Sequence, residues 1–316
     1  MGHARYIAKV AMQAHLTPPD GGGRLRRFAW GFGLPFGVVR AAFHDHAVRS
    51  HWLRWTAIQL TVLFAAGVRI GLARSDLFER HVHPKFADVA AFVTASYAAL
   101  TILEWVLIAL SRDYHDALSQ MAASATGVVA EPLLGPPRIR LDFGWLWVKM
   151  KRRIRALWLL ATALPIVSLA LFVPRIGDEV YLALMTAWTA YWLAVFAIGG
   201  SFVAWESAAP GAPWFVRMFQ AAGRVPVLGI PFRVYARFLA RATRSVTPVC
   251  AVFERDPWAA AGLAVARGLV GVPGVYLFFR PAFSVAATHT ILGQGMAVTP
   301  SIRHEPPQIS SAPDRR

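Results

Sequence analysis

Four long apolar blocks constrain this chain more than any other feature of its sequence. They cover residues 55–72, 86–110, 156–172 and 180–205, and Pro165 interrupts the third block. A helix that crosses a hydrocarbon core of about 30 Å needs about 20 apolar residues. Only 16% of the 316 residues are charged, whereas about a quarter are charged in a typical soluble domain. The sequence therefore predicts an all-α, polytopic integral membrane protein.

A further apolar stretch, residues 258–292, is too long for one straight span and too short for two. As a single helix it would extend about 52 Å. Pro281 lacks a backbone N–H and disfavours helix at Arg280. We therefore expect one span over 258–279, kinked at Pro273-Gly274, and then a short returning helix over 282–292. The alternative is an irregular hairpin that crosses the membrane fully in both directions.

The predicted architecture has about five full spans, a terminal helix that penetrates the bilayer only partly, and interfacial amphipathic helices. Residues 1–27 form a flexible basic N-terminal segment, 28–293 a single helical membrane domain, and 294–316 a disordered C-terminal tail. The aromatic-rich part of the domain before residue 55 is expected to be an interfacial helix. The one cysteine, Cys250, excludes an intrachain disulfide and a multi-cysteine metal site. No cleavable signal peptide is expected.

The distribution of Lys and Arg predicts the orientation in the membrane. The segments before residue 55, over 111–155 and over 206–258 hold 23 of them, whereas the two short loops between spans hold 4. Basic loops stay in the cytoplasm, so the N-terminus is expected there. The net charge of +16 then indicates contact with anionic lipid and not with nucleic acid. The usage of 29 Arg against 4 Lys is typical of a GC-rich bacterium, which indicates a multi-pass protein of the cell (inner) membrane.

The two ends of the apolar region resemble the CysZ / etoposide-induced-protein family of membrane proteins. The resemblance lies in "GFGLPFGVVRAAFHDHAVRSHWLRWTAIQL" and "AAAGLAVARGLVGVPGVYLFFRPAFSVAATHTIL". It implies a helical fold that mixes full spans with partly penetrating helices, and the bacterial branch is associated with sulfate uptake. Anion contacts are proposed there near a Gly and an Arg before the first long helix. The nearest match is the run from Gly37 to Arg40, which lacks a paired arginine and so does not carry sulfate specificity over.

Three ionisable residues lie inside apolar stretches, where a charge costs about 2.5–3.5 kcal/mol on insertion scales. Arg69 lies near the end of its span and can extend to the interface. Glu104 and Arg267 are expected at similar depth, facing the bundle interior, where they can pair as a structural ion pair or as part of a transport path. The candidates for a transport path are Glu104, Arg267, Arg280, Pro273, Pro281 and Arg40.

The segment "PFRVYARFLARATR" predicts a basic amphipathic helix on the membrane surface. Arg233, Arg237, Arg241 and Arg244 are spaced by four, four and three residues, which places them on one helical face. Each arginine near an anionic lipid surface contributes about 1 kcal/mol of attraction.

The histidines do not have the spacing of a metal site. His44 and His46 point about 200° apart on a helix, and His44 and His51 lie about 10 Å apart along it. His81 and His83 are expected on the opposite side of the membrane. No metal, no cofactor and no enzyme constellation is therefore predicted.

Two functions are compatible with these features. The first is a membrane permease or channel-like protein of the CysZ type that passes a small anion such as sulfate. The second is a non-transporting membrane scaffold that binds anionic lipid head groups or partner proteins. Assembly as a homo-oligomer is compatible with either function.

Overall fold

The computed structural model describes residues 16–19, 21, 23–79, 86–128, 136–141, 143–199, 211–225 and 229–294. This part of the chain is helical and contains no strand. Its helices, in chain order, are α2 (Arg24–Phe43), α3 (His46–Glu79), α4 (Phe86–Leu110), α5 (Arg112–Ala125), α6 (Phe143–Ala161), α7 (Leu164–Val167), the 3-10 helix η1 (Ser168–Phe172), α8 (Gly177–Ile198), α9 (Trp214–Ala222), α10 (Gly229–Thr243), α11 (Thr247–Arg255), α12 (Pro257–Leu269) and α13 (Val275–Leu292). The predicted tail over 294–316 lies outside the described residues except for Gln294, as do residues 1–15 of the predicted N-terminal segment.

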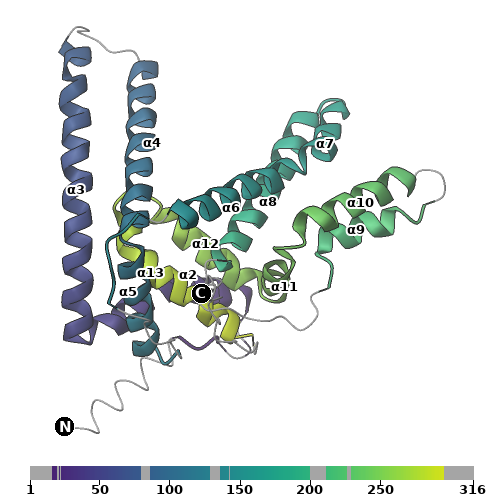
Figure 1. Ribbon diagram of the computed structural model, residues 1–316. Coiled ribbons are helices and arrows are strands. Elements are labelled where there is room, and N and C mark those ends of the chain that lie inside the picture. Colours follow the sequence, from purple (N-terminus) through teal and green to yellow (C-terminus); the bar gives the residue numbers. More distant parts are fainter. Residues whose placement is uncertain are drawn as a thin grey trace, which may run out of the picture.

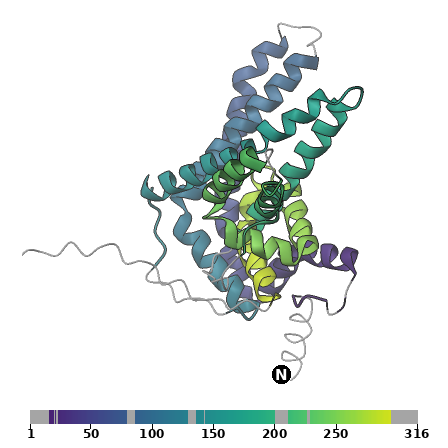
Figure 2. The same cartoon turned by 90° about the vertical axis from the view of Figure 1, so that its right-hand side faces the viewer.

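Three helical arms project from a central group of helices (Figure 1). The arms are the α3–α4 hairpin, the pair formed by α6 with α8, and the shorter α9–α10 hairpin. The central group contains α2, α5, α12 and α13. The far ends of α3–α4 and of α6–α8 point in the same direction in both views, away from α2 and α5 (Figures 1 and 2).

Four helical segments are long and apolar enough to cross a membrane: His46–Leu72, Asp88–Leu110, Ile154–Phe172 and Gly177–Ile198. They coincide with the four apolar blocks of the sequence, so the prediction of an all-α chain with four candidate membrane spans is confirmed. Most of their side chains are not covered by protein, and Phe64 is 75% exposed. Apolar side chains that face outward on such helices are suited to contact with lipid.

The bounds of these helices differ from the predicted ones in two places. The polar lead-in from His46 and the first apolar block form one continuous helix, α3. The third block is broken after Ala161, and Pro165 lies in the first turn of α7, where a missing backbone N–H is tolerated.

The division predicted for the last apolar stretch is right about an interruption at Pro273-Gly274 but wrong about Pro281. The predicted span over 258–279 is two helices, because α12 ends at Leu269 and α13 begins at Val275. Gly274 adopts a φ of 90°, a left-handed conformation that glycine reaches without steric cost. Pro281 does not end a helix but lies inside α13. At about 20 Å and 27 Å, these helices are shorter than the four candidate spans, so the predicted fifth span has no counterpart among the described helices that are long and apolar enough to cross a membrane.

The α2 helix crosses α12 with backbone in contact with backbone. It begins at Arg24, before the expected domain boundary at residue 28. A Cβ atom on Gly31 would overlap the carbonyl oxygen of Ala259, and one on Gly262 would overlap Phe28 and lie 2.7 Å from the backbone nitrogen of Phe32. Such close approach of two helices requires glycine or other small residues at the crossing.

The principal core surrounds this crossing and includes Leu34, Val38, Leu263, Ala266 and Phe283. It joins side chains of α2, α12 and α13, and α5 packs on the same group. The arms join this core at their bases, where Trp52 of α3 and Ala197 of α8 are buried in it.

We expect Gly262→Ala to lower the thermal stability of the protein, because the added methyl group has to separate α2 from α12. Overpacking of this kind costs about 1–3 kcal/mol, and backbone cannot move aside as a flexible side chain does. The matched control is Gly268→Ala on the same helix, where a Cβ meets nothing within 4 Å. That change should be neutral or stabilising, since alanine favours helix by about 1 kcal/mol over glycine.

Thermal unfolding of the detergent-solubilised variants measures the difference. Equal unfolding temperatures for the two alanine variants would contradict the close crossing.

Candidate functional site

A cluster of buried polar side chains lies where α3, α4, α5 and α13 meet. Gln59 on α3, Glu104 on α4, and Ser111 and His115 at the start of α5 are each no more than 5% exposed. The helices that carry them pack on one another, and α5 also packs on α13. A buried polar group is costly unless it is hydrogen-bonded, so the partners of each group determine what the cluster can do.

Hydrogen bonds connect Gln59, Ser111 and His115 in a fixed order. The Ser111 hydroxyl donates its single hydrogen to the carbonyl oxygen of Leu107, at 2.6 Å. The Gln59 atom that lies 2.6 Å from that hydroxyl must therefore be the amide nitrogen, which donates. The same nitrogen lies 3.1 Å from Nε2 of His115, so Nε2 accepts. The proton of the neutral imidazole is then on Nδ1, a tautomer assigned from the network.

His115 is a neutral hydrogen-bond donor with an unused N–H. Its Nδ1 is buried and has no hydrogen-bond partner within the described residues. Burial, and secondly the positive charge of Arg280, hold the pKa of His115 well below 6.5. A second proton, on Nε2, would also face the N–H of Gln59. The ring is thus kept neutral, with a donor free for another group.

Arg280 on α13, a helix that packs on α5, carries a second unpaired donor, and its charge acts on His115. Its Nη1 is buried, and its side chain makes no hydrogen bond or ion pair in the part of the chain that the structure describes. An unpaired buried donor costs about 1–3 kcal/mol, and more when it is charged. The ionisable residues that act on Arg280 electrostatically are Tyr276, Asp116, Arg267 and Glu104.

Glu104 and Arg267 do not form the expected pair. Glu104 is buried, as predicted, but its Oε1 accepts a hydrogen bond from the backbone N–H of Gly274 at 3.2 Å. Arg267 donates through Nη1 to the carbonyl oxygen of Phe196 at 3.1 Å and through Nη2 to the Tyr276 hydroxyl at 3.4 Å. Both side chains therefore hold the turn between α12 and α13 against its neighbours.

The other predicted candidates lie apart from this cluster or belong to the backbone. Arg40 is exposed on α2, and Arg69 is exposed on α3. Pro273 is part of the α12–α13 turn, and Pro281 is buried in α13 directly after Arg280. The structure thus brings Glu104, Arg267 and Arg280 into one region and leaves Arg40 outside it.

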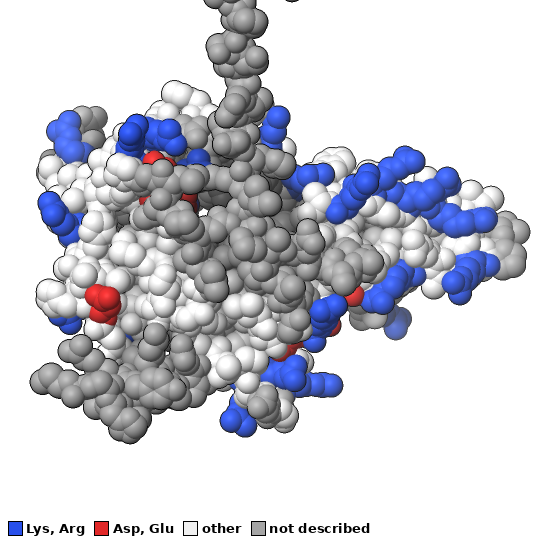
Figure 3. All heavy atoms as spheres, turned by 60° about the horizontal axis from the view of Figure 1, so that its bottom comes forward, with Lys and Arg blue, Asp and Glu red and all other residues white. Residues whose placement is uncertain are grey.

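The predicted arginine-rich helix is present as α10. Arg233, Arg237, Arg241 and Arg244 are exposed, and Leu239 turns into the protein. Arg217 and Arg224 on and next to α9 are also exposed. Basic side chains are prominent along the projecting α9–α10 arm (Figure 3).

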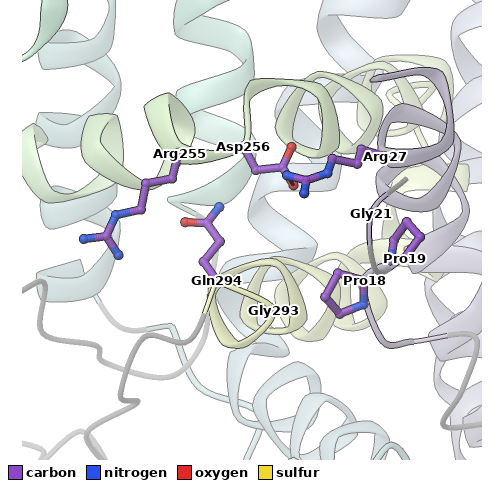
Figure 4. A pocket seen from close by; sticks show the side chains of 8 residues that line it. All are labelled: Pro18, Pro19, Gly21, Arg27, Arg255, Asp256, Gly293 and Gln294. Carbon is purple, nitrogen blue, oxygen red and sulfur yellow. Dashed lines mark hydrogen bonds and ion pairs between the residues drawn. The ribbon is translucent and has the colours of Figure 1, made fainter. Parts of the chain in front are cut away.

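A shallow cleft of about 320 Å³ lies beside the end of α13 (Figure 4). Asp256 there pairs with Arg27 at 3.3 Å and accepts from the backbone N–H of Ala259, which caps α12. The Gln294 amide donates to the carbonyl oxygen of Val252. Most of these polar groups are used in holding helix ends, so the cleft is secondary to the buried cluster.

Metal binding receives no support from the described residues, among which no group of three potential ligands occurs. His44, His46 and His51 are exposed, and His81 and His83 lie outside the described part. Comparison of the chain with protein-family models, with curated proteins and with solved structures finds no match. The resemblance to the CysZ family therefore stays a prediction.

Sequence reasoning missed His115, Gln59 and Ser111. His115 lies in a segment too polar to span a membrane, so nothing marked it as buried. The sequence signal that could have identified His115 as buried is its spacing from Leu118 and Ala122. This spacing places all three residues on one face of α5, and that face is buried.

We expect the protein to lose stability as the pH falls below 6.5, in part through His115. Its folded-state pKa is lowered, so below 6.5 the unfolded chain binds a proton that the folded chain excludes. Stability is therefore full above 6.5 and is lost progressively towards the folded-state pKa.

The unfolding temperature of His115→Gln should fall less between about pH 7.5 and about pH 5.5 than that of the wild type. His51→Gln, which changes an exposed histidine, should follow the wild type. If all three proteins respond equally to pH, His115 is not the neutral, buried group described.

Proposed function

We propose that this protein is a membrane permease or channel-like protein of the CysZ type that passes a small anion such as sulfate. The observation that carries the proposal is the partly buried guanidinium of Arg280, whose buried Nη1 has no hydrogen-bond partner among the described residues. A buried cation without a partner is expensive, and ionisable groups inside membrane proteins mark ion and substrate paths. An anion passing through the protein would supply the missing charge.

The broken helices around Arg280 support the same proposal. The α12–α13 turn exposes backbone that lipid cannot satisfy, so it requires protein or water around it. Tyr97 donates to the carbonyl oxygen of Gly271 at 3.1 Å, and Glu104 accepts from Gly274. Interrupted helices with polar contacts at the break are a recurrent feature of transport sites.

The proposed location is the cell (inner) membrane, with the N-terminus in the cytoplasm. In this orientation the basic segments, including the α9–α10 arm, lie on the cytoplasmic side next to anionic lipid. A homo-oligomer is compatible with this arrangement.

A non-transporting scaffold is the second candidate, favoured by the exposed arginines of α9 and α10. Arg217 pairs with Glu254 at 2.9 Å, and the other five arginines of the projecting arm are suited to binding anionic lipid head groups or an acidic partner. This function requires no path through the protein, so flux separates the two candidates.

We expect liposomes that contain the purified protein to take up labelled sulfate, and Arg280→Gln to reduce the uptake at least tenfold. Loss of one charge-assisted hydrogen bond of about 1.5–3 kcal/mol corresponds to roughly ten- to a hundredfold. Arg280→Lys, which keeps the charge, should retain more uptake. Arg49→Gln removes an exposed arginine of α3 and should leave uptake unchanged.

Absence of uptake by folded, reconstituted wild-type protein, tested with several small anions, would overturn the permease proposal and leave the scaffold.

We also expect anionic lipid to raise the unfolding temperature of the detergent-solubilised protein, because the lipid head groups bind the arginines of the α9–α10 arm. Replacing Arg233, Arg237, Arg241 and Arg244 together by Gln should reduce this effect, since each contributes about 1 kcal/mol near an anionic surface. The matched control replaces four exposed arginines of the other basic segments, which do not share one helical face and should lose less lipid stabilisation together: Arg26, Arg49, Arg54 and Arg138. If the control loses as much lipid stabilisation as the arm variant, the arm has no special role.

A further inference from the structure

Two buried N–H groups on neighbouring helices lack an acceptor among the described residues. One is Nδ1 of His115 on α5, and the other is Nη1 of Arg280 on α13. The two helices pack on each other, and the charge of Arg280 acts on His115. A single ligand between α5 and α13 could therefore accept from both.

We infer that His115 and Arg280 form one binding site, in which each donates an N–H to the same small oxyanion. The inference rests on the proposed function for the role of the anion as cargo, whereas binding itself can be tested without flux. The inference adds His115 as a second, uncharged hydrogen-bond donor beside Arg280, and His115 lies in a segment outside the predicted spans.

The hydrogen-bond order of the cluster makes His115 a donor and nothing else. Nε2 is occupied by the Gln59 amide, whose orientation is set by Ser111 and Leu107. The imidazole therefore cannot turn an acceptor towards a ligand without breaking these bonds. Gln59 and Ser111 position His115 and need not touch the anion.

The charges around the site limit which anion it takes. Asp116 pairs with Arg112 at 3.6 Å, and Glu104 accepts from Gly274, so both carboxylates are already engaged. An anion that carries a proton, such as monohydrogen phosphate, needs an acceptor for that proton, and the two free groups offer none. The site is therefore suited to oxyanions whose oxygens are all unprotonated.

The test measures anion binding by the full-length purified protein as a rise in unfolding temperature with sodium sulfate, nitrate or phosphate at constant ionic strength. Ligand bound only by the folded state stabilises it in proportion to the logarithm of its concentration relative to Kd. We expect stabilisation by sulfate or nitrate, with phosphate weaker at neutral pH. His115→Phe and Arg280→Gln should each weaken binding about tenfold or more, the factor for about 1.4 kcal/mol.

Two further variants keep the test decisive if His115→Phe fails to fold. His115→Gln keeps an amide donor and should weaken binding less than Arg280→Gln. Ser119→Ala is the packing control, because this buried hydroxyl on α5 bonds only to the carbonyl oxygen of His115 in its own helix. It should bind anion as the wild type does.

A double-mutant cycle tests whether the two residues hold the same anion. If they do, the double variant loses less binding free energy than the sum of the single losses. The inference is overturned if the losses of binding free energy are additive, or if both His115 variants bind anion as the wild type does. It is also overturned if anions do not stabilise the wild type, and the two donors would then be assigned to buried water.

Failure of the inference is distinguishable from failure of the permease proposal. If Arg280→Gln abolishes uptake but both His115 variants preserve it, the permease proposal stands and the shared binding site is overturned. Anion binding that depends on both residues without any uptake would leave the site and overturn the permease.

Discussion

The crossing of α2 and α12 is the contact on which the central helices depend. Gly31 and Gly262 let the two backbones touch, and neither position has room for a methyl group. Because α13 and α5 pack on α2, the crossing also sets where these two helices lie relative to each other. Side chains of α5 and α13 can then face one another in the interior, although about 160 residues of sequence separate His115 from Arg280.

The polar groups of the interior divide into those that hold the fold and those that are left over. Glu104 and Arg267 are used at the α12–α13 turn, and Asp256 is used in capping α12 and pairing with Arg27. A buried charge that serves only structure is normally paired, because an unpaired one is the expensive state. Arg280 breaks this rule, and His115 beside it leaves a donor unused. Neutral donors without a partner among the described residues also occur elsewhere, at Trp30 and Trp192, so it is the charge of Arg280 that distinguishes the proposed site from structural polar contacts.

The elements that the sequence predicted are those in which local chemistry alone sets the structure. Residues 86–110 are predominantly apolar and form α4 with those bounds, and the arginine spacing of α10 predicts its exposed face. The interruption at Pro273-Gly274 was predicted, whereas the helix end predicted at Pro281 is absent: proline is a strong local helix breaker, but here it lies inside α13. The Glu104–Arg267 pair failed for a related reason: depth in the membrane says nothing about rotation around a helix. His115 became visible only once α5 was seen to pack on α13.

The buried cluster and the arginine arm place positive charge in environments of different dielectric. On α9 and α10 the guanidinium groups are exposed, so salt screens their attraction to lipid and each contributes little alone. Arg280 is partly buried, so its charge is screened less and would act more strongly on a single small anion. A neutral donor such as His115 adds a contact there without adding a second charge. An anion held by one full charge and one neutral N–H can also leave again, as conduction requires.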